Sequence, residues 1–135
     1  MSVFVDTSAW YALGSKDDDE HEAARAVYED LVDRQEPLIT TSYVLAETMG
    51  LIQRRLGWRA LELFAAAAQT IDVVWVDRAR HREAEALLFE RRRREINIVD
   101  AASFTAMRAL GIRDAFAFDD DFEREGFRVL KPPRR

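Results

Sequence analysis

The sequence predicts an α/β fold in which helices cover both faces of a central, mostly parallel sheet of about five short strands. Short apolar runs of the kind that form buried strands recur along the whole chain. Amphipathic segments that begin with capping residues separate most of these runs, and strands that alternate with helices pair in parallel. No linker, repeat or low-complexity stretch interrupts the alternation, so we expect one domain over residues 1–135.

The chain begins with the apolar run 3–5, which predicts a short buried strand leading into a helix start at Asp6. Residues 15–20 are polar and acidic and predict a loop. Apolar side chains then recur at helical spacing, which predicts an amphipathic helix over residues 21–35.

The middle of the chain repeats the pattern of strand and helix. Residues 38–40 predict a strand, and Thr41 or Ser42 can cap a helix that ends near Gly57. A further helix is expected over residues 58–70, where a run of alanines allows close packing.

The last part of the chain holds the remaining elements. The apolar run 73–76 predicts a strand, and Asp77 caps a helix over residues 78–94 whose final arginines complement the helix dipole. A helix over residues 99–110 ends at Gly111. A short acidic turn joins the last two predicted strands, 115–118 and 127–130.

Composition excludes several kinds of site. The chain has no cysteine and only two histidines, so neither a disulfide framework nor a zinc site of nitrogen and sulfur ligands is expected. The net charge of -5 argues against a protein coated with basic residues for non-specific nucleic-acid binding. No apolar stretch reaches about 18 residues and the amino terminus has no signal-peptide pattern, so we expect a cytoplasmic protein without a membrane span.

Four acidic residues stand where a helix or strand would normally carry an apolar or neutral side chain: Asp6, Glu47, Asp100 and Asp119. Asp6 and Asp119 follow the first and fourth predicted strands, at the edge where parallel sheets bind ligands. Glu47 and Asp100 lie within the apolar stripes of their helices. Because an unpaired buried carboxylate is strongly destabilising, four that converge indicate a bound cation.

Helix capping is an alternative role for two of these acids. Asp6 precedes a predicted helix, and Asp100 lies in the first turn of one, where the helix dipole favours a negative charge. Glu47 has no capping role, and only an ion pair with Arg54 or Arg55 would explain its position without a metal.

The ligand set indicates a hard divalent cation, because clustered carboxylates raise one another's pKa and Mg²⁺ or Mn²⁺ prefers oxygen ligands. Such an ion acidifies its bound water and stabilises charge on phosphoryl oxygens, so the hypothesis is metal-dependent hydrolysis of phosphodiester bonds. The hydroxyls of Thr7 and Ser8 either cap the helix or orient Asp6 or a metal-bound water. The residues alone do not distinguish RNA from DNA.

A polyanion also needs cations near an acidic site. Candidates for phosphate contacts are the run Arg91, Arg92, Arg93 and Arg94, with Arg54, Arg55 and Arg59. Such runs also occur as solvated helix faces, so both interpretations stay open.

Four strings of the sequence, VFVDTSAWYAL, TTSYVLAET, INIVDAASFTAMRALGI and AFAFDDDFEREGFRVL, resemble successive blocks of PIN-domain nucleases, most closely those of the VapC toxins of toxin–antitoxin pairs. The resemblance spans almost the whole chain in the family's order. It implies a PIN-like fold and an endoribonuclease that acts on structured RNA such as tRNA. It also implies Mg²⁺ or Mn²⁺ as the cofactor, a cognate antitoxin and a homodimer.

The resemblance assigns the metal-binding and catalytic roles to the four acids named above, with Thr7 or Ser8 as the neighbouring hydroxyl. The last block departs from the family's pattern, because the two variable positions after Asp119 are also acidic, Asp120 and Asp121. The spacing to the following phenylalanine selects Asp119 and leaves Asp121 as a candidate auxiliary metal ligand.

Two other classes of protein remain open. A catalytically silent PIN-like module would keep the fold as a protein-interaction scaffold, and RNA cleavage that is lost with EDTA or with Glu47→Gln would exclude it. A receiver domain that accepts a phosphoryl group also carries acids at strand ends, but it needs a lysine beside them, and Lys131 lies too far along the last strand. Apolar residues that could serve protein contacts or the core are Trp10, Tyr43, Trp58 and Phe64.

Overall fold

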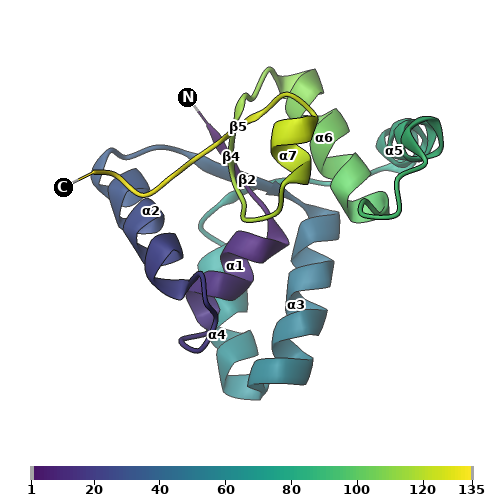
Figure 1. The fold of residues 1–135 in the computed structure, drawn as a ribbon. Helices are drawn as coiled ribbons and strands as arrows, with labels where there is room; N and C mark the ends of the chain where they lie inside the picture. Colours follow the sequence, from purple (N-terminus) through teal and green to yellow (C-terminus); the bar gives the residue numbers. More distant parts are fainter. Residues whose placement is uncertain (1, 135) are drawn as a thin grey trace.

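The computed structural model describes residues 2–134 and contains a five-stranded sheet in which all neighbouring strands are parallel (Figure 1). The strand order is β3-β2-β1-β4-β5. The strands are β1 (Val3–Val5), β2 (Leu38–Thr41), β3 (Asp72–Val74), β4 (Asp114–Phe116) and β5 (Arg128–Val129). The predicted α/β class is confirmed, and the sheet is fully parallel.

Seven helices connect these strands within residues 2–134: α1 (Thr7–Gly14), α2 (His21–Asp33), α3 (Ser42–Leu56), α4 (Trp58–Ala68), α5 (Arg78–Arg91), α6 (Ile98–Leu110) and α7 (Asp121–Arg124). The chain builds the sheet in one direction from β1 to β3 and then crosses to the other side of β1. Because such crossovers are right-handed, the reversal places the helices before and after β3 on opposite faces. Figure 1 agrees, with α1, α3 and α4 in the lower part of the view, α2 at the left, and α6 and α7 in the upper part.

Several boundaries differ from the prediction. β4 ends at Phe116, earlier than expected, because the backbone N–H of Phe118 donates to the hydroxyl of Ser8 (3.0 Å) and not to a neighbouring strand. β3 is displaced to residues 72–74, and β5 holds only two residues. The predicted acidic turn contains the short helix α7, whose first turn carries Asp121.

The helix α5 was expected to continue to residue 94 but ends at Arg91. Arg92 adopts a left-handed backbone conformation (φ 50°), which stops the helix. The four arginines therefore do not form one helix face, and their side chains have separate surroundings.

An aromatic cluster fixes α7 against α6 and the sheet. The ring of Phe122 meets the ring of Phe104 edge-on at a centroid distance of 5.0 Å and lies 6.2 Å from the ring of Phe4. Each of the three side chains is at most 1% exposed. Full burial of a ring of this size stabilises the fold by about 1.5–3 kcal/mol, so the cluster holds the loop that carries Asp119 in place.

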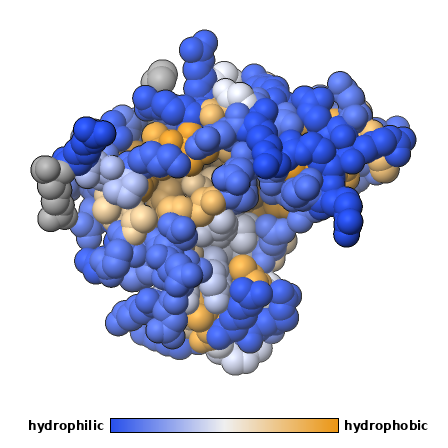
Figure 2. Space-filling model, viewed as in Figure 1, coloured by the Kyte–Doolittle hydropathy of each residue, from blue (hydrophilic) through white to orange (hydrophobic). Residues whose placement is uncertain are grey.

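Hydrophilic residues cover most of the face seen in Figure 2, and apolar residues show mainly in a band across its middle. No helix within residues 2–134 combines the length and the apolar character that crossing a lipid bilayer requires. The large apolar side chains that are more than half exposed include Trp58, Leu63, Trp75 and Phe89. Exposed side chains of this size are candidates for contacts with other chains.

Candidate metal centre

Three of the four predicted acids meet at the carboxyl edge of the sheet. Asp6 follows β1, Asp119 follows β4 in the next strand position, and Asp100 lies in the first turn of α6. One carboxylate oxygen from each lies within 4.8 Å of the others. The site is the crevice at the point where the strand order reverses, where open parallel sheets bind their ligands.

The fourth acid, Glu47, lies on α3 in the wall of the same cleft but outside the cluster of three. The cleft has a volume of about 520 Å³. Its lining residues are Asp6, Thr7, Ser8, Ala46, Glu47, Gly50, Leu51, Arg54, Asn97, Asp100 and Asp119. All four predicted acids therefore face one cleft.

Asp6 is both a helix cap and a member of the cluster. Its Oδ2 accepts hydrogen bonds from the backbone N–H (3.2 Å) and the hydroxyl (2.7 Å) of Ser8. The Ser8 hydroxyl also accepts the N–H of Phe118, which leads into the loop of Asp119. Thr7 differs, because its hydroxyl accepts a bond from Thr48 (3.1 Å) on α3. Of the two predicted hydroxyls, Ser8 is the one that contacts Asp6.

Asn97, which is not among the predicted site residues, connects Asp100 to Glu47. Its side-chain oxygen accepts the N–H of Asp100 (3.0 Å), while its own backbone N–H donates to the Asp100 carboxylate (2.9 Å). Its side-chain amide also donates to Oε2 of Glu47 (3.3 Å). The spacing Asn-x-x-Asp before an apolar run is a capping-box pattern and was the available signal. The bond to Glu47, 50 residues away, had no signal in the sequence.

Burial and mutual repulsion disfavour ionisation of the clustered acids. Burial raises the pKa of Asp100 to about 7, and the charges of Asp6 and Glu47 add to the rise. Burial raises the pKa of Asp119 to about 7, again with repulsion from Asp6 and Asp100. Burial also raises the pKa of Asp6, although the bonds from Ser8 oppose the change. Each shift is what a missing counter-charge produces.

The donor set fits a hard divalent cation. Within residues 2–134, no Lys, Arg or His side chain forms an ion pair with Asp6, Asp100 or Asp119. Carboxylate oxygens are the ligands that Mg²⁺ and Mn²⁺ prefer. A cation among the three carboxylates would remove the repulsion that raises their pKa values.

Asp121, the predicted auxiliary ligand, forms an ion pair with Arg93 and is 7% exposed. Its backbone N–H donates to Oδ1 of Asp119 (3.2 Å). In this arrangement the backbone N–H of Asp121 positions the Asp119 carboxylate, while Arg93 neutralises the charge of the Asp121 carboxylate. Asp120 is exposed and lines a separate small hollow with Lys131.

Of the four arginines in the predicted run, Arg91 and Arg93 form ion pairs, whereas Arg92 and Arg94 form none within the described residues. Arg91 donates two hydrogen bonds to Glu125 (3.0 and 3.2 Å), which also accepts one from Arg108 (2.8 Å). Burial pushes the pKa of Glu125 upward, but these bonds outweigh it and hold the pKa below its usual range. Arg92 and Arg94 are exposed and have no charged partner within residues 2–134.

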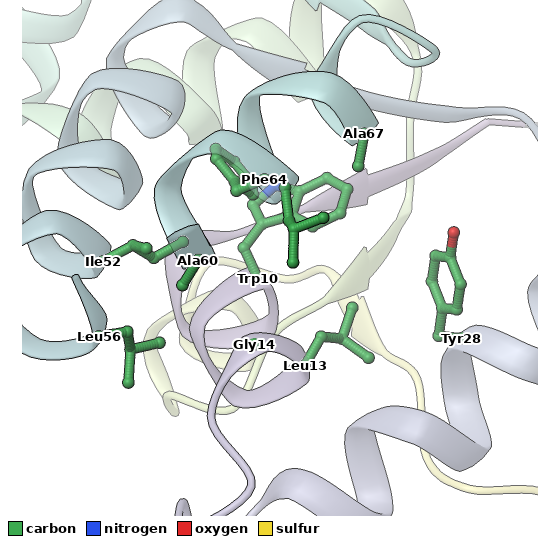
Figure 3. Close-up of a pocket in the computed structure, with 10 residues that line it drawn as sticks. Trp10, Leu13, Gly14, Tyr28, Ile52, Leu56, Ala60, Phe64 and Ala67 are labelled. Carbon is green, nitrogen blue, oxygen red and sulfur yellow. The ribbon is translucent and has the colours of Figure 1, made fainter. Parts of the chain in front are cut away.

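A second hollow, of about 340 Å³, lies between α1, α2, α3 and α4 and is apolar (Figure 3). Trp10 and Phe64 form its wall, with ring centroids 5.6 Å apart and exposures of 7% and 8%. The indole N–H of Trp10 is buried and has no hydrogen-bond partner within residues 2–134. Of the other predicted apolar candidates, Tyr43 packs against His81 and Trp58 is 68% exposed.

The family model of the PIN domain matches residues 3–127, so the chain belongs to the PIN-domain family. It is 38% identical over 136 residues to the 23S rRNA-specific endonuclease VapC20 of Mycobacterium tuberculosis. This alignment covers 96% of this chain and 98% of VapC20. The crystal structure of Mycobacterium tuberculosis VapC20, described as a sarcin-ricin loop cleaving toxin, matches with a TM-score of 0.86 over 96% of this chain and 99% of that one. The predicted family and its likeness to VapC toxins are confirmed.

More distant structures show the same fold. VapBC2 from Rickettsia felis, bound to a DNA fragment from its promoter, matches with a TM-score of 0.70 at 12% identity over 96% of this chain and 98% of that one. A toxin–antitoxin complex from Klebsiella pneumoniae matches with a TM-score of 0.67 at 13% identity over 98% of this chain and 99% of that one. The fold of this chain is thus shared with proteins whose sequences differ widely from it.

The raised pKa values predict how stability depends on pH and metal. Between pH 4 and 7 the folded protein keeps protons on Asp100 and Asp119 that the unfolded chain, with the usual pKa of 3.8, has released. The metal-free protein is therefore expected to lose stability as the pH rises through this range. Mn²⁺ at about 100 times its dissociation constant should restore about 2.7 kcal/mol at neutral pH. Thermal unfolding with and without Mn²⁺ measures both effects.

Asp100→Asn is the test variant for this prediction, because an amide can still accept the N–H of Asn97. Without metal it should be at least as stable as wild type at pH 7, and its midpoint should respond much less to Mn²⁺. A wild-type midpoint that ignores both pH and Mn²⁺ would contradict the interpretation of the cluster as a metal centre.

Asn97→Ser tests whether Asn97 positions Glu47. Serine still caps α6 but cannot donate to Glu47, so the midpoint without metal should stay close to wild type. Loss of a bond that orients a metal ligand typically lowers metal affinity by about 10- to 100-fold. Calorimetric titration with Mn²⁺ measures the change, and Asp77→Ser, at the cap of α5, is the matched control. Equal affinities for the two variants would show that Asn97 serves only as a cap.

Proposed function

We propose that this protein is a divalent-metal-dependent endoribonuclease and the toxin of a VapC-type toxin–antitoxin pair. The observation that carries the proposal is the convergence of Asp6, Asp100 and Asp119, with oxygens within 4.8 Å, in the crevice of a PIN fold. The 38% identity to a 23S rRNA-specific endonuclease supports the same activity.

In the proposed reaction, the three clustered carboxylates would hold Mg²⁺ or Mn²⁺, and Glu47 on α3 would add a fourth carboxylate in the same cleft. The ion supplies an acidified water and stabilises charge on the phosphoryl oxygens. Ser8 keeps the Asp6 carboxylate in one orientation through two hydrogen bonds, and Asn97 does the same for Asp100 and Glu47. The protein thereby fixes the acids before the substrate arrives, which is the condition for effective electrostatic stabilisation.

The proposed substrate is the RNA of the large ribosomal subunit, at a sarcin–ricin-type loop. The support is the specificity of VapC20 for 23S rRNA, since VapC20 and this chain align over almost their whole lengths. Cleavage of tRNA, which the wider family resemblance implies, is the alternative and is an outcome of the experiment below.

Two other functions are less well supported. A silent interaction module has no need of three acids whose pKa values are raised by burial and by repulsion from neighbouring carboxylates. A receiver domain needs a lysine in the acidic cleft, but Lys131 lines a different hollow, where its ammonium lies 3.5 Å from Glu123.

The proposal includes an antitoxin that covers the apolar groove of Figure 3. Leu63 and Tyr28 at this groove are 57% and 36% exposed, and the buried N–H of Trp10 lacks an acceptor. An apolar peptide segment could fill the groove. A homodimer is also proposed, for which the hollow lined by Met49 and Trp75 offers an apolar surface.

The purified protein should cleave large-subunit ribosomal RNA with Mg²⁺ or Mn²⁺ and should stop when EDTA is added. Asp119→Asn should lower the rate by at least about 100-fold, the order lost when a group that stabilises the transition state is removed. Asp120→Asn, at the exposed neighbouring acid, is the control and should remain active. Primer extension locates the cut. Activity that survives EDTA would overturn the metal mechanism. If tRNA is cleaved while ribosomal RNA stays intact, the proposed substrate is wrong.

Leu63→Asp should prevent a stable complex with the antitoxin, because a carboxylate in an apolar groove loses its hydration without gaining a partner. Co-expression with the proposed cognate antitoxin and co-purification measure the complex. Leu110→Asp, at another exposed leucine outside the groove, is the control. If both variants still bind the antitoxin, its docking site lies elsewhere on the toxin.

A further inference from the structure

The carboxylate cleft is lined by four acids and, within residues 2–134, by one cation, Arg54. Arg54 lies in the last turn of α3. Its Nη1 lies 3.8 Å from the position that a Cβ atom would take on Gly50. The side chain therefore runs back along the helix toward Glu47, and the guanidinium lies over the glycine in the cleft.

No acid neutralises Arg54 within residues 2–134, and its side chain is exposed. The position one helical turn before it, where an acid would form an ion pair, is Gly50. The neighbouring Arg55 has different surroundings, because its guanidinium lies over the ring of Tyr11 at 5.6 Å and lines another hollow. Arg93, the charge nearest Asp121, is already paired. Arg54 is thus a free cation that faces the acidic site.

The wall between Arg54 and the carboxylates is open. Ala46, Gly50 and Arg54 follow one another at intervals of four residues, which places them on one stripe of α3. Two small residues in this stripe leave room for a nucleotide to lie against the helix. Arg54 follows Glu47 by seven residues, about 10 Å along the axis. Even when the side chain folds back over Gly50, the guanidinium can bind a phosphate beside the carboxylate cluster and not one within it.

We propose that Arg54 forms a phosphate-binding subsite on the α3 wall of the cleft, which holds the backbone phosphate next to the one that is cleaved. Guanidinium matches phosphate with two parallel hydrogen bonds, and the planar fork requires little further ordering. A cleft lined by four acids repels a polyanion, so a fixed cation at its edge sets where the strand can enter. The assignment rests on the proposed ribonuclease function for the identity of the polyanion as RNA.

Arg54→Gln tests the subsite, with Arg55→Gln as the control in the same helical turn. Both changes remove one charge near the carboxyl end of α3, so effects of the helix dipole and of net charge are matched. For Arg54→Gln we expect KM to rise about 10-fold and kcat to stay within about 2-fold, because a flanking contact binds substrate and transition state equally. The slope of log KM against log salt should fall by about 0.7, the value for one contact to a single strand.

Arg54→Lys separates charge from geometry. A lysine keeps the charge, so the salt slope should return to the wild-type value, but it lacks the fork, so KM should recover only in part. A fall in kcat without a change in KM would place Arg54 at the reacting phosphate and overturn the flanking subsite. Equal KM values and salt slopes for Arg54→Gln and Arg55→Gln would overturn it as well, while the ribonuclease function would stand.

Binding is measured separately from cleavage, so that the two proposals can fail independently. In the Asp119→Asn background, fluorescence anisotropy with a labelled RNA oligonucleotide should show about 10-fold weaker binding when Arg54→Gln is added, and no such change for Arg55→Gln. If the wild-type protein cleaves no RNA, the proposed function falls and this titration alone decides the subsite. Unchanged binding by the Arg54→Gln variant would then exclude the subsite too.

Discussion

The fold must hold three carboxylates together although they repel one another. Each is anchored by a backbone N–H: Asp6 by that of Ser8, Asp100 by that of Asn97, and Asp119 by that of Asp121. These bonds favour the ionised forms, yet the pKa values of Asp100 and Asp119 still rise to about 7. The rigid surroundings, and not the acids' own preference, therefore keep the site assembled, and this is the arrangement a cation needs in order to bind without reorganising the protein.

A second set of charges supports the first. Glu125, whose side chain is 3% exposed, joins the end of α5 to α6 through Arg91 and Arg108, and Arg93 reaches Asp121 beside the cluster. The arginines are partly exposed but the Glu125 carboxylate is nearly inaccessible, so removing both Arg91 and Arg108 would leave a buried charge without these partners, which is destabilising. Two of the four consecutive arginines thus stabilise the loop of Asp119.

The alternation of strands and helices, and the position of Asp6 and Asp119 at strand ends, followed from local patterns of the sequence. The convergence of Asp100 with them followed from the topology of a parallel sheet. Asn97 could not be found in the same way, because its bond to Glu47 depends on how α3 and α6 approach each other. The ion pairs of Arg93 and Glu125 could not be predicted either, since a run of arginines has the same sequence pattern whether its side chains face solvent or a buried acid. The early end of β4 depends on the Ser8 hydroxyl, a contact between residues 110 positions apart.

The distribution of cations also bears on selectivity. With a net charge of -5 and two of the four clustered arginines engaged in ion pairs, the chain has few free cations near the cleft. Affinity for nucleic acid rises with the number of phosphates neutralised, so a site with few contacts binds arbitrary RNA weakly at physiological salt. In the subsite proposed above, Arg54 would supply one such contact, for the phosphate next to the one at the carboxylate cluster. The acidity of the protein thus favours weak binding to arbitrary RNA, so that affinity has to come from contacts that a particular target makes in the cleft.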